Sequence, residues 1–413
     1  MRVGNVCTIK LMHGKPVPLG ELDRYRRAWK GMDGIVAELQ GSVRNSDGTS
    51  PPSRPDLANF DYIRLVAASA VIFSHSFLLA DGHERNEPFV RMLGEKNILG
   101  LYGVFTFFII SGFLITQSAC TSRSVGAFAW SRILRIYPAL ICCAAFCGVV
   151  LGSIFTVVPL VDYWMQLLPL DYTASTSLLP GSRGWSIPTV IFYPGGGSLA
   201  EGINGSLWTI PQELTCYVIV GLLFLVRGLR WHVAAAICVL CLPLMLLPFP
   251  IVPKMLSDFL FVAPSFAFGA LIYLLWGRRT LPLWPLFICA GIAVGAVWAG
   301  KVLQFFPLFA AYPLIRLATA QHFRLPSLRK FGDVSYGMYL YGWPIEQVAR
   351  ALLGEATSWW AIFAIALPVS AALGFVSWHL VEKRALQFKK WRPVVMAASN
   401  HRGWRHSTAN RAG

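Results

Sequence analysis

Long apolar segments recur along residues 56–390 and are separated by short polar stretches. A helix of about 20 apolar residues spans the roughly 30 Å hydrocarbon core of a bilayer. About ten segments have this length and character. The pattern therefore predicts an all-α, polytopic membrane helix bundle of about ten transmembrane helices. The predicted spans are residues 59–80, 98–118, 136–158, 206–226, 232–250, 257–276, 282–299, 302–320, 334–353 and 359–381.

The two ends of the chain lack this pattern. Residues 1–55 are polar and basic, and they finish in a stretch rich in Ser and Pro that is typical of a disordered linker. Residues 391–413 are again polar and basic. We therefore expect three parts: a basic cytoplasmic tail with its linker (1–55), a transmembrane domain (56–390) and a second basic cytoplasmic tail (391–413).

The distribution of charge indicates the orientation. Only 14% of the residues are charged, whereas a soluble protein carries about 25%. If the N-terminus is cytoplasmic, the ten spans place 29 of the 36 Lys and Arg residues on the cytoplasmic side and 7 on the other. Cytoplasmic loops carry such an excess of positive charge, so both termini are expected in the cytoplasm. The net charge of +16 then reflects topology and attraction to the lipid bilayer, and argues against nucleic-acid binding.

The first span carries an arginine and a histidine on one helical face. His75 follows Arg64 by eleven residues, which turn a helix through three turns plus about 20°. The same spacing separates the two side chains by about 16 Å along the axis, with Arg64 nearer the cytoplasm. Ionisable groups inside a membrane are costly and usually functional. The pair is therefore a candidate site, although a lone histidine on an apolar helix is more often structural.

Two further arginines open the third span from the cytoplasm. Arg132 and Arg135 are three residues apart, so both side chains project from one side of the helix. Guanidinium groups in this arrangement can bind phosphate oxygens bidentately. The alternative is that they are ordinary flanking charges of a membrane helix.

Carboxylates enter two spans from the outer side. Glu213 lies about two turns into the fourth span, at a depth close to that of His75, and Glu346 lies toward the outer end of the ninth. A carboxylate beside an imidazole orients it and stabilises its charged form. We therefore interpret Glu213 as the partner of His75. The alternative is a structural hydrogen bond to a neighbouring helix.

Other chemistry finds little support in the sequence. The nine cysteines lack a His/Cys set with metal-ligand spacing, so we expect no metal site and interpret the eight that lie in or beside spans as packing residues. No Gly-x-Ser-x-Gly nucleophile motif occurs. The outer segment 159–205 is rich in glycine and aromatic residues, which serve either as interfacial anchors or as surfaces for sugar rings.

Taken in order, these motifs resemble the bacterial acyltransferase-3 family of integral-membrane O-acyltransferases, which modify O-antigen, exopolysaccharide and Nod factor. The resemblance covers residues 56–390. The matching motifs are Asp61-x-x-Arg64 with ten residues to His75, Phe107-Phe-Ile-Ile-Ser111-Gly112-Phe, Arg132-x-x-Arg135-Ile-Tyr-Pro138, Ser206-Leu-Trp-Thr-Ile-Pro-Gln-Glu213, Ser335-Tyr-Gly-Met-Tyr339-Leu and Val381-Glu382.

The resemblance implies an enzyme of the bacterial cytoplasmic (inner) membrane. Its co-substrate is an acyl-CoA, usually acetyl-CoA, which is not permanently bound and enters from the cytoplasm. Its acceptor is a hydroxyl of a polysaccharide or lipid-linked glycan. By position His75 is the catalytic histidine, and the donor site contains Arg64, Arg132 and Arg135. Many relatives have a second histidine where this chain has Gly342, which argues against a mechanism with two histidines.

Two catalytic routes and two other functions stay open at this level. Neutral His75 either deprotonates the acceptor hydroxyl or carries the acyl group as a covalent intermediate. Buried ionisable residues also mark transport pathways, so a transporter or exporter of an acyl group or small substrate is the alternative. No internal repeat is evident, which weakens that alternative. A membrane glycosyltransferase is a weaker third possibility, because the outer acidic residues form no motif.

Overall fold

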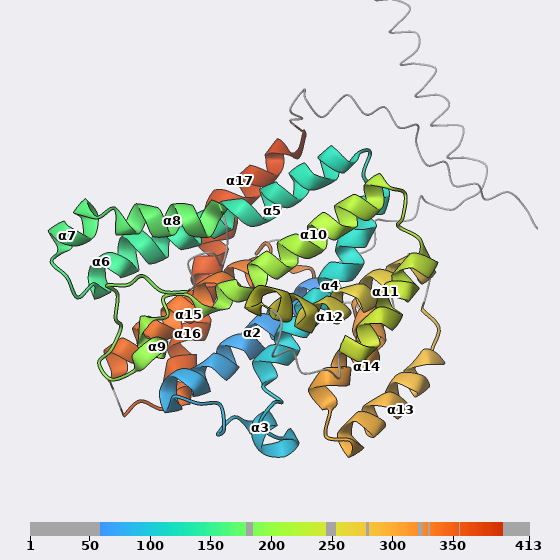
Figure 1. Cartoon of the computed structure of the whole chain (residues 1–413), viewed down its shortest axis with the longest axis horizontal. Coiled ribbons are helices and arrows are strands. Elements are labelled where there is room, and N and C mark those ends of the chain that lie inside the picture. Colours follow the sequence, from blue (N-terminus) through green and yellow to red (C-terminus); the bar gives the residue numbers. More distant parts are fainter. Residues whose placement is uncertain are drawn as a thin grey trace, which may run out of the picture. The chain divides into compact units, whose positions relative to one another are not determined.

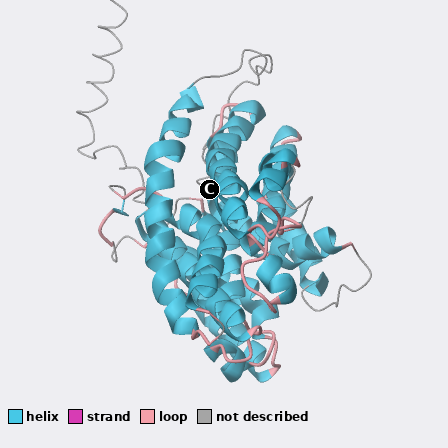
Figure 2. Ribbon diagram, turned by 90° about the vertical axis from the view of Figure 1, so that its left-hand side faces the viewer, coloured by secondary structure: helices cyan, strands magenta, loops and turns pink. Residues whose placement is uncertain are grey.

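The computed structural model describes residues 58–178, 185–244, 253–277, 281–320, 325–328, 331–354 and 356–390. The chain divides into the units Met1–Pro55 and Asp56–Gly413. The predicted tails, residues 1–55 and 391–413, lie outside the described residues. Within the described ranges the structure consists of helices and loops without a strand, as Figure 2 shows. The predicted all-helical class is therefore confirmed.

Each of the ten predicted spans contains a helix. They are α2 (Ala58–Asp81), α4 (Leu99–Thr121), α5 (Val125–Ala145) with its extensions η1 (Phe146–Leu151) and α6 (Gly152–Phe155), α10 (Ile210–Leu225), α11 (Trp231–Leu244), α12 (Lys254–Trp276), α13 (Pro285–Trp298), α14 (Val302–Ala318), α15 (Val334–Leu353) and α16 (Trp359–Ser377). The helix of α16 continues through η4 (Trp378–Glu382), α17 (Lys383–Ala385) and η5 (Leu386–Lys390).

Six helical segments of the described chain are long and apolar enough to cross a membrane. Three further apolar helices are shorter, and α15 is more polar than the rest. These features agree with a membrane helix bundle. The number of crossings and the cytoplasmic location of the termini stay predictions. The six segments are Ala58–Asp81, Leu99–Thr121, Val125–Phe155, Gly205–Leu225, Lys254–Trp276 and Trp359–Lys389.

Short helices occupy the loops on the predicted outer side. They are α3 (Pro88–Leu93), α7 (Leu160–Met165), α8 (Leu168–Leu178), α9 (Gly197–Glu201) and the 3₁₀ turn η2 (Gly205–Thr209). After α7 the chain reverses, and α8 runs back along α5 (Figure 1). The hydroxyl of Tyr163 donates to the carbonyl oxygen of Gly148 at 2.7 Å and fixes this reversal. Part of the predicted outer loop is thus packed helix.

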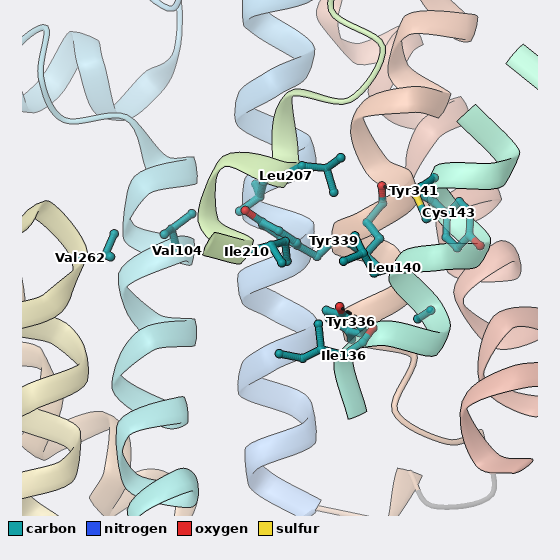
Figure 3. Close-up of a cluster of buried hydrophobic side chains, with 14 of the residues drawn as sticks. Val104, Ile136, Leu140, Cys143, Leu207, Ile210, Val262, Tyr336, Tyr339 and Tyr341 are labelled. Atoms are coloured by element: carbon teal, nitrogen blue, oxygen red, sulfur yellow. Dashed lines mark hydrogen bonds between the residues drawn. The ribbon is translucent and has the colours of Figure 1, made fainter. Parts of the chain in front are cut away.

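Helix α15 lies at the centre of the packing, against α2 on one side and α16 on another. Fifteen of its twenty residues are buried, although the helix carries four tyrosine and tryptophan side chains with polar groups. Internal partners explain how these groups are tolerated: Tyr336 donates to the carbonyl of Ile136 at 3.2 Å, and Tyr339 donates to that of Ser206 at 2.9 Å. Figure 3 shows these tyrosines among apolar side chains of the surrounding helices.

Helices α4 and α12 approach each other through paired glycines. A Cβ atom at Gly112 would lie 2.0 Å from the carbonyl oxygen of Phe266, and one at Gly269 would lie 2.0 Å from that of Ile109. Backbones come this close in membranes where small residues face each other. The two glycines therefore set the separation of α4 and α12.

We expect Gly112→Ala to weaken this contact, because the added methyl group meets backbone that cannot rotate away. The expected loss is about 1–3 kcal/mol of unfolding free energy. Gly291 on α13 is the matched control, since a Cβ there meets nothing within 4 Å. Thermal unfolding of the detergent-solubilised variants measures the effect. Equal stability of Gly112→Ala and Gly291→Ala would contradict the proposed close contact.

Candidate active site

The three arginines singled out in the sequence line one cavity of about 150 Å³. Arg64 comes from α2, whereas Arg132 and Arg135 come from α5. Residues of α4, α10 and α15 complete the wall. Among them are Val104, Ile210, Tyr336 and Tyr339, which are labelled in Figure 3 together with Ile136 of α5, another residue of the lining. The structure thus brings together side chains that lie far apart along the chain.

Two of these arginines are held by a buried ionic network. Asp333, just before α15, accepts a hydrogen bond from Arg64 at 2.6 Å and another from Arg135. Arg135 also pairs with Glu382 at 2.9 Å, and the side chain of Glu382 is 1% exposed. Ser335 donates to the second oxygen of Asp333 at 2.7 Å. The network fixes the guanidinium groups at one end of the cavity.

Arg132 is bound differently. Its guanidinium donates to the hydroxyls of Ser131 and Ser118 at 3.2 and 3.3 Å, and it lies 6.0 Å from the ring centre of Tyr217. In the described part of the chain no carboxylate forms an ion pair with it. Arg132 therefore presents a positive charge to the cavity that a bound anion can neutralise.

Glu213 lies in this same cavity. Its Oε1 accepts hydrogen bonds from Ser111 at 3.2 Å and from the hydroxyl of Tyr217. Glu213 thus faces the arginine site. The sequence suggested that Glu213 contacts the imidazole of His75, but in the structure a different carboxylate makes this contact.

That carboxylate is Glu346 of α15. Its Oε2 lies 3.5 Å from Nδ1 of His75, and its Oε1 accepts a hydrogen bond from Ser76 at 3.0 Å. The side chain of Glu346 is 0% exposed, whereas that of His75 is 21% exposed. The ring of Trp343 packs edge-on against the imidazole, with 4.8 Å between centres. An accessible imidazole thus rests against a buried carboxylate and an indole.

The glycine at position 342 suits the close packing of α15 on α2. A Cβ atom at Gly342 would lie 3.0 Å from Cγ1 of Ile72, one turn before His75. A side chain at this position would therefore require Ile72 to shift. The site is therefore built around one imidazole from α2 and one carboxylate from α15.

The loop segment that precedes α10 is bound to α15 next to this site. The carbonyl oxygen of Gly202 accepts hydrogen bonds from Trp343 at 2.7 Å and from Gln347 at 2.8 Å. Asn204 is fully buried and donates to the carbonyl of Leu340 at 3.0 Å. These bonds tie the start of η2 to α15 beside His75. The sequence offers no signal for this contact beyond the polar residues that precede the fourth span.

Metal ligation has no candidate in the described ranges, where no group of three or more His, Cys, Asp or Glu side chains could hold an ion. What the site offers chemically is therefore a base, a carboxylate beside it, and an arginine-rich cavity. The base and the cavity are joined by α2, which carries both His75 and Arg64.

Comparison with known proteins identifies the family of the chain. Residues 57–379 match the model of the acyltransferase domain of the acyltransferase-3 family. The chain is 30% identical over 359 residues to Nodulation protein 10 of Rhizobium leguminosarum bv. viciae, covering 80% of this chain and 94% of the relative. It is 27% identical over 347 residues to an O-acetyl transferase of Shigella phage Sf6, covering 79% and 95%.

A third relative, the acyltransferase MdmB of Streptomyces mycarofaciens, is 28% identical over 208 residues, which cover 48% of this chain and 49% of the relative. No solved structure matches. The family match extends over most of the chain and includes the helices that carry the imidazole and the arginines. The resemblance inferred from the motifs is confirmed: the chain is an acyltransferase and belongs to the acyltransferase-3 family.

Proposed function

We propose that this membrane protein transfers an acyl group, in the simplest case acetyl, from acyl-CoA to a hydroxyl of a polysaccharide or lipid-linked glycan. The name of one relative, the O-acetyl transferase of Shigella phage Sf6, supports acetyl as the transferred group. The proposed location is the bacterial cytoplasmic membrane. The observation that carries the proposal is the pairing of His75 with the buried Glu346. His75 lies on α2, the helix that also carries Arg64 of the arginine cavity.

In the proposed reaction His75 acts as general base. Its unprotonated ring nitrogen takes the proton of the acceptor hydroxyl as that oxygen attacks the thioester carbonyl. Collapse of the tetrahedral intermediate breaks the C–S bond, and the imidazolium returns its proton to the leaving thiolate. Glu346 holds the ring orientation and stabilises the imidazolium while it exists. A covalent acyl-histidine route would differ by accumulating an acylated enzyme when acceptor is withheld.

The arginine cavity is the proposed site for the phosphates of the donor. Arg64 is about 16 Å from His75 along α2 by helical rise, so the thioester end of an extended donor can reach the imidazole from there. Arg64 and Arg135 are already paired with Asp333, whereas Arg132 forms no ion pair within the described residues. Arg132 is therefore expected to contribute most to phosphate binding.

Arg132→Gln should raise the KM for acyl-CoA about tenfold, because it removes a charge-assisted hydrogen bond to phosphate. We expect kcat to change much less. Arg123→Gln is the matched control, since Arg123 is exposed at the same end of α5 and lies outside the cavity. Steady-state kinetics in proteoliposomes measure both constants. An unchanged KM in Arg132→Gln would contradict the assignment.

Replacement of the two carboxylates distinguishes their roles. Glu346→Gln should lower kcat about 100-fold with little change in KM, because the amide stabilises the imidazolium poorly. Glu213→Gln should affect kcat far less, since Glu213 contacts Ser111 and Tyr217 in the arginine cavity. A larger loss of kcat in Glu213→Gln would restore Glu213 as the partner of His75.

The function itself is tested by comparing surface glycans of cells with and without this chain. NMR spectroscopy of the isolated glycans should show O-acetyl signals only when the chain is present. Proteoliposomes that contain the purified protein should also consume acetyl-CoA when a glycan acceptor is supplied. Movement of substrate across the vesicle membrane without acyl transfer would instead support a transporter.

A further inference from the structure

A second cavity lies between α10, α11 and α12, with one wall residue from α4. Its volume is about 300 Å³, twice that of the arginine cavity. Its lining contains residues at positions 216–230 around the end of α10, at 234–241 on α11 and at 259–274 on α12. His75 and the three arginines of the proposed active site are absent from this lining, so the two cavities are distinct.

The lining is almost entirely aliphatic and aromatic. Thr116, Cys216, Cys241 and Arg230 also belong to the lining, but polar atoms form almost none of its surface. An apolar cavity of this kind does not hold ordered water, because water finds too few hydrogen-bond partners there. Left empty, its walls lose their dispersion contacts. The chemistry of the walls therefore calls for an apolar occupant.

The volume sets the size of that occupant. An apolar cavity of about 150 Å³ admits benzene, with six carbon atoms. By proportion a cavity of 300 Å³ has room for on the order of ten to twelve carbon atoms. This corresponds to a large part of one lipid acyl chain.

Arg230, the single charged residue of the lining, indicates the kind of headgroup that the occupant carries. Arg230 lies in the turn between α10 and α11, which the charge distribution places on the cytoplasmic side, and its side chain is exposed. Basic residues at this surface attract anionic lipid headgroups. The apolar part of the cavity extends from Arg230 between α10 and α12, both of which belong to segments long enough to cross the membrane.

We propose that this cavity binds one acyl chain of an anionic phospholipid of the surrounding bilayer, with the headgroup phosphate at Arg230. The occupied cavity joins α10 to α12 through the lipid chain. Helix α10 also forms part of the arginine cavity through Glu213 and Tyr217, whereas Cys216 and Val220 line the lipid site. A bound lipid chain therefore packs against α10 and supports this wall of the arginine cavity.

The site can be located with a photoactivatable phosphatidylglycerol that carries a diazirine on its acyl chain. The full-length protein is reconstituted in phosphatidylcholine vesicles that contain this probe, irradiated, digested and analysed by mass spectrometry. We expect cross-links to cavity residues of α10, α11 and α12. Unlabelled phosphatidylglycerol should compete better than phosphatidylcholine. Labels confined to outward-facing residues, or equal competition by the two lipids, would overturn the proposal.

Matched variants separate cavity binding from general lipid contact. Ala234→Phe fills the cavity and should reduce these cross-links to background, whereas Ala236→Phe, at an exposed position of the same helix, should leave them unchanged. Ala267→Leu fills the same space from α12 if Ala234→Phe fails to fold. Persistence of the cross-links in a folded, cavity-filled variant would overturn the proposal.

The headgroup is tested separately. Arg230→Gln should weaken the competition by phosphatidylglycerol about fivefold, since one basic residue contributes about that factor to anionic lipid binding. Arg227→Gln is the control, because Arg227 is exposed in the same turn and lies outside the lining. Stronger competition by a long-chain acyl-CoA than by phosphatidylglycerol would assign the cavity to a substrate chain and overturn its assignment to a bilayer lipid.

Discussion

Replacement of His75 by alanine should lower the rate of acyl transfer by about 10²–10⁴-fold while the protein still inserts and folds. This range is the usual contribution of a positioned general base. The imidazole is the only group in the proposed mechanism that takes the proton of the acceptor hydroxyl. Its removal leaves the arginine cavity intact, so the KM for acyl-CoA should change little. Release of free CoA in the presence of acceptor measures the rate.

His379 provides the matched control for this experiment. It lies in the helix that continues from α16, is partly exposed, and packs against Phe375 with 4.1 Å between ring centres. It lines neither the arginine cavity nor the lipid site. His379→Ala should therefore retain full activity. Retained activity in His75→Ala, with an elution profile like that of the unmodified protein, would remove His75 from the mechanism.

The sequence predicts most reliably those relations that lie within one helix. The eleven-residue spacing places Arg64 and His75 on one face of α2, and the three-residue spacing pairs Arg132 with Arg135. Both relations depend only on helical geometry. In the structure side chains of α2 and α5 meet at Asp333, and all three arginines line one cavity. The motifs suggest a shared site for these arginines, but spacing alone does not require it.

The partner of His75 could not be chosen from the sequence. Glu213 and Glu346 both lie toward the outer side of their predicted spans. The choice depends on which helix packs against α2. In the structure α15 packs along α2, whereas α10 packs against α4, α5 and α12. Hydropathy gives the depth of a residue, but it contains no information about which helices are neighbours.

The packed helices of the outer segment escaped prediction for another reason. The run 168–178 is short and carries Asp171 and several Ser and Thr residues, so it lacks the length and the apolar character of a span. It becomes helical because it packs against α5 and η1, where Gly148 allows Pro169 to approach: a Cβ there would lie 2.7 Å from the carbonyl oxygen of Pro169. Tertiary contact of this kind is invisible in local periodicity.

The ionic network at the arginine cavity leads to the second large prediction. Asp333 joins α2 to α5 through Arg64 and Arg135, and its side chain is only 16% exposed. Burial alone would raise its pKa, but the guanidinium groups of Arg135 and Arg64 outweigh burial and lower the pKa of Asp333 to about 2. The carboxylate is therefore charged at neutral pH.

Asp333→Asn should lower the free energy of unfolding by about 3–5 kcal/mol, because both guanidinium groups lose their ion pair with Asp333 and only Arg135 keeps its pair with Glu382. The stabilisation by Asp333 should be constant above the ordinary aspartate pKa of about 3.9 and disappear as the pH falls toward 2. Asp258→Asn is the control: Asp258 pairs with Lys254, whose side chain is 71% exposed, so the loss should stay below about 1 kcal/mol. Denaturant titration of both variants in detergent at pH 7 measures the difference.

Because Arg64 and Arg135 also line the cavity, Asp333→Asn should change the KM for acyl-CoA, whereas Asp258→Asn should not. Equal stability of the two variants would show that the network contributes no more than a surface ion pair.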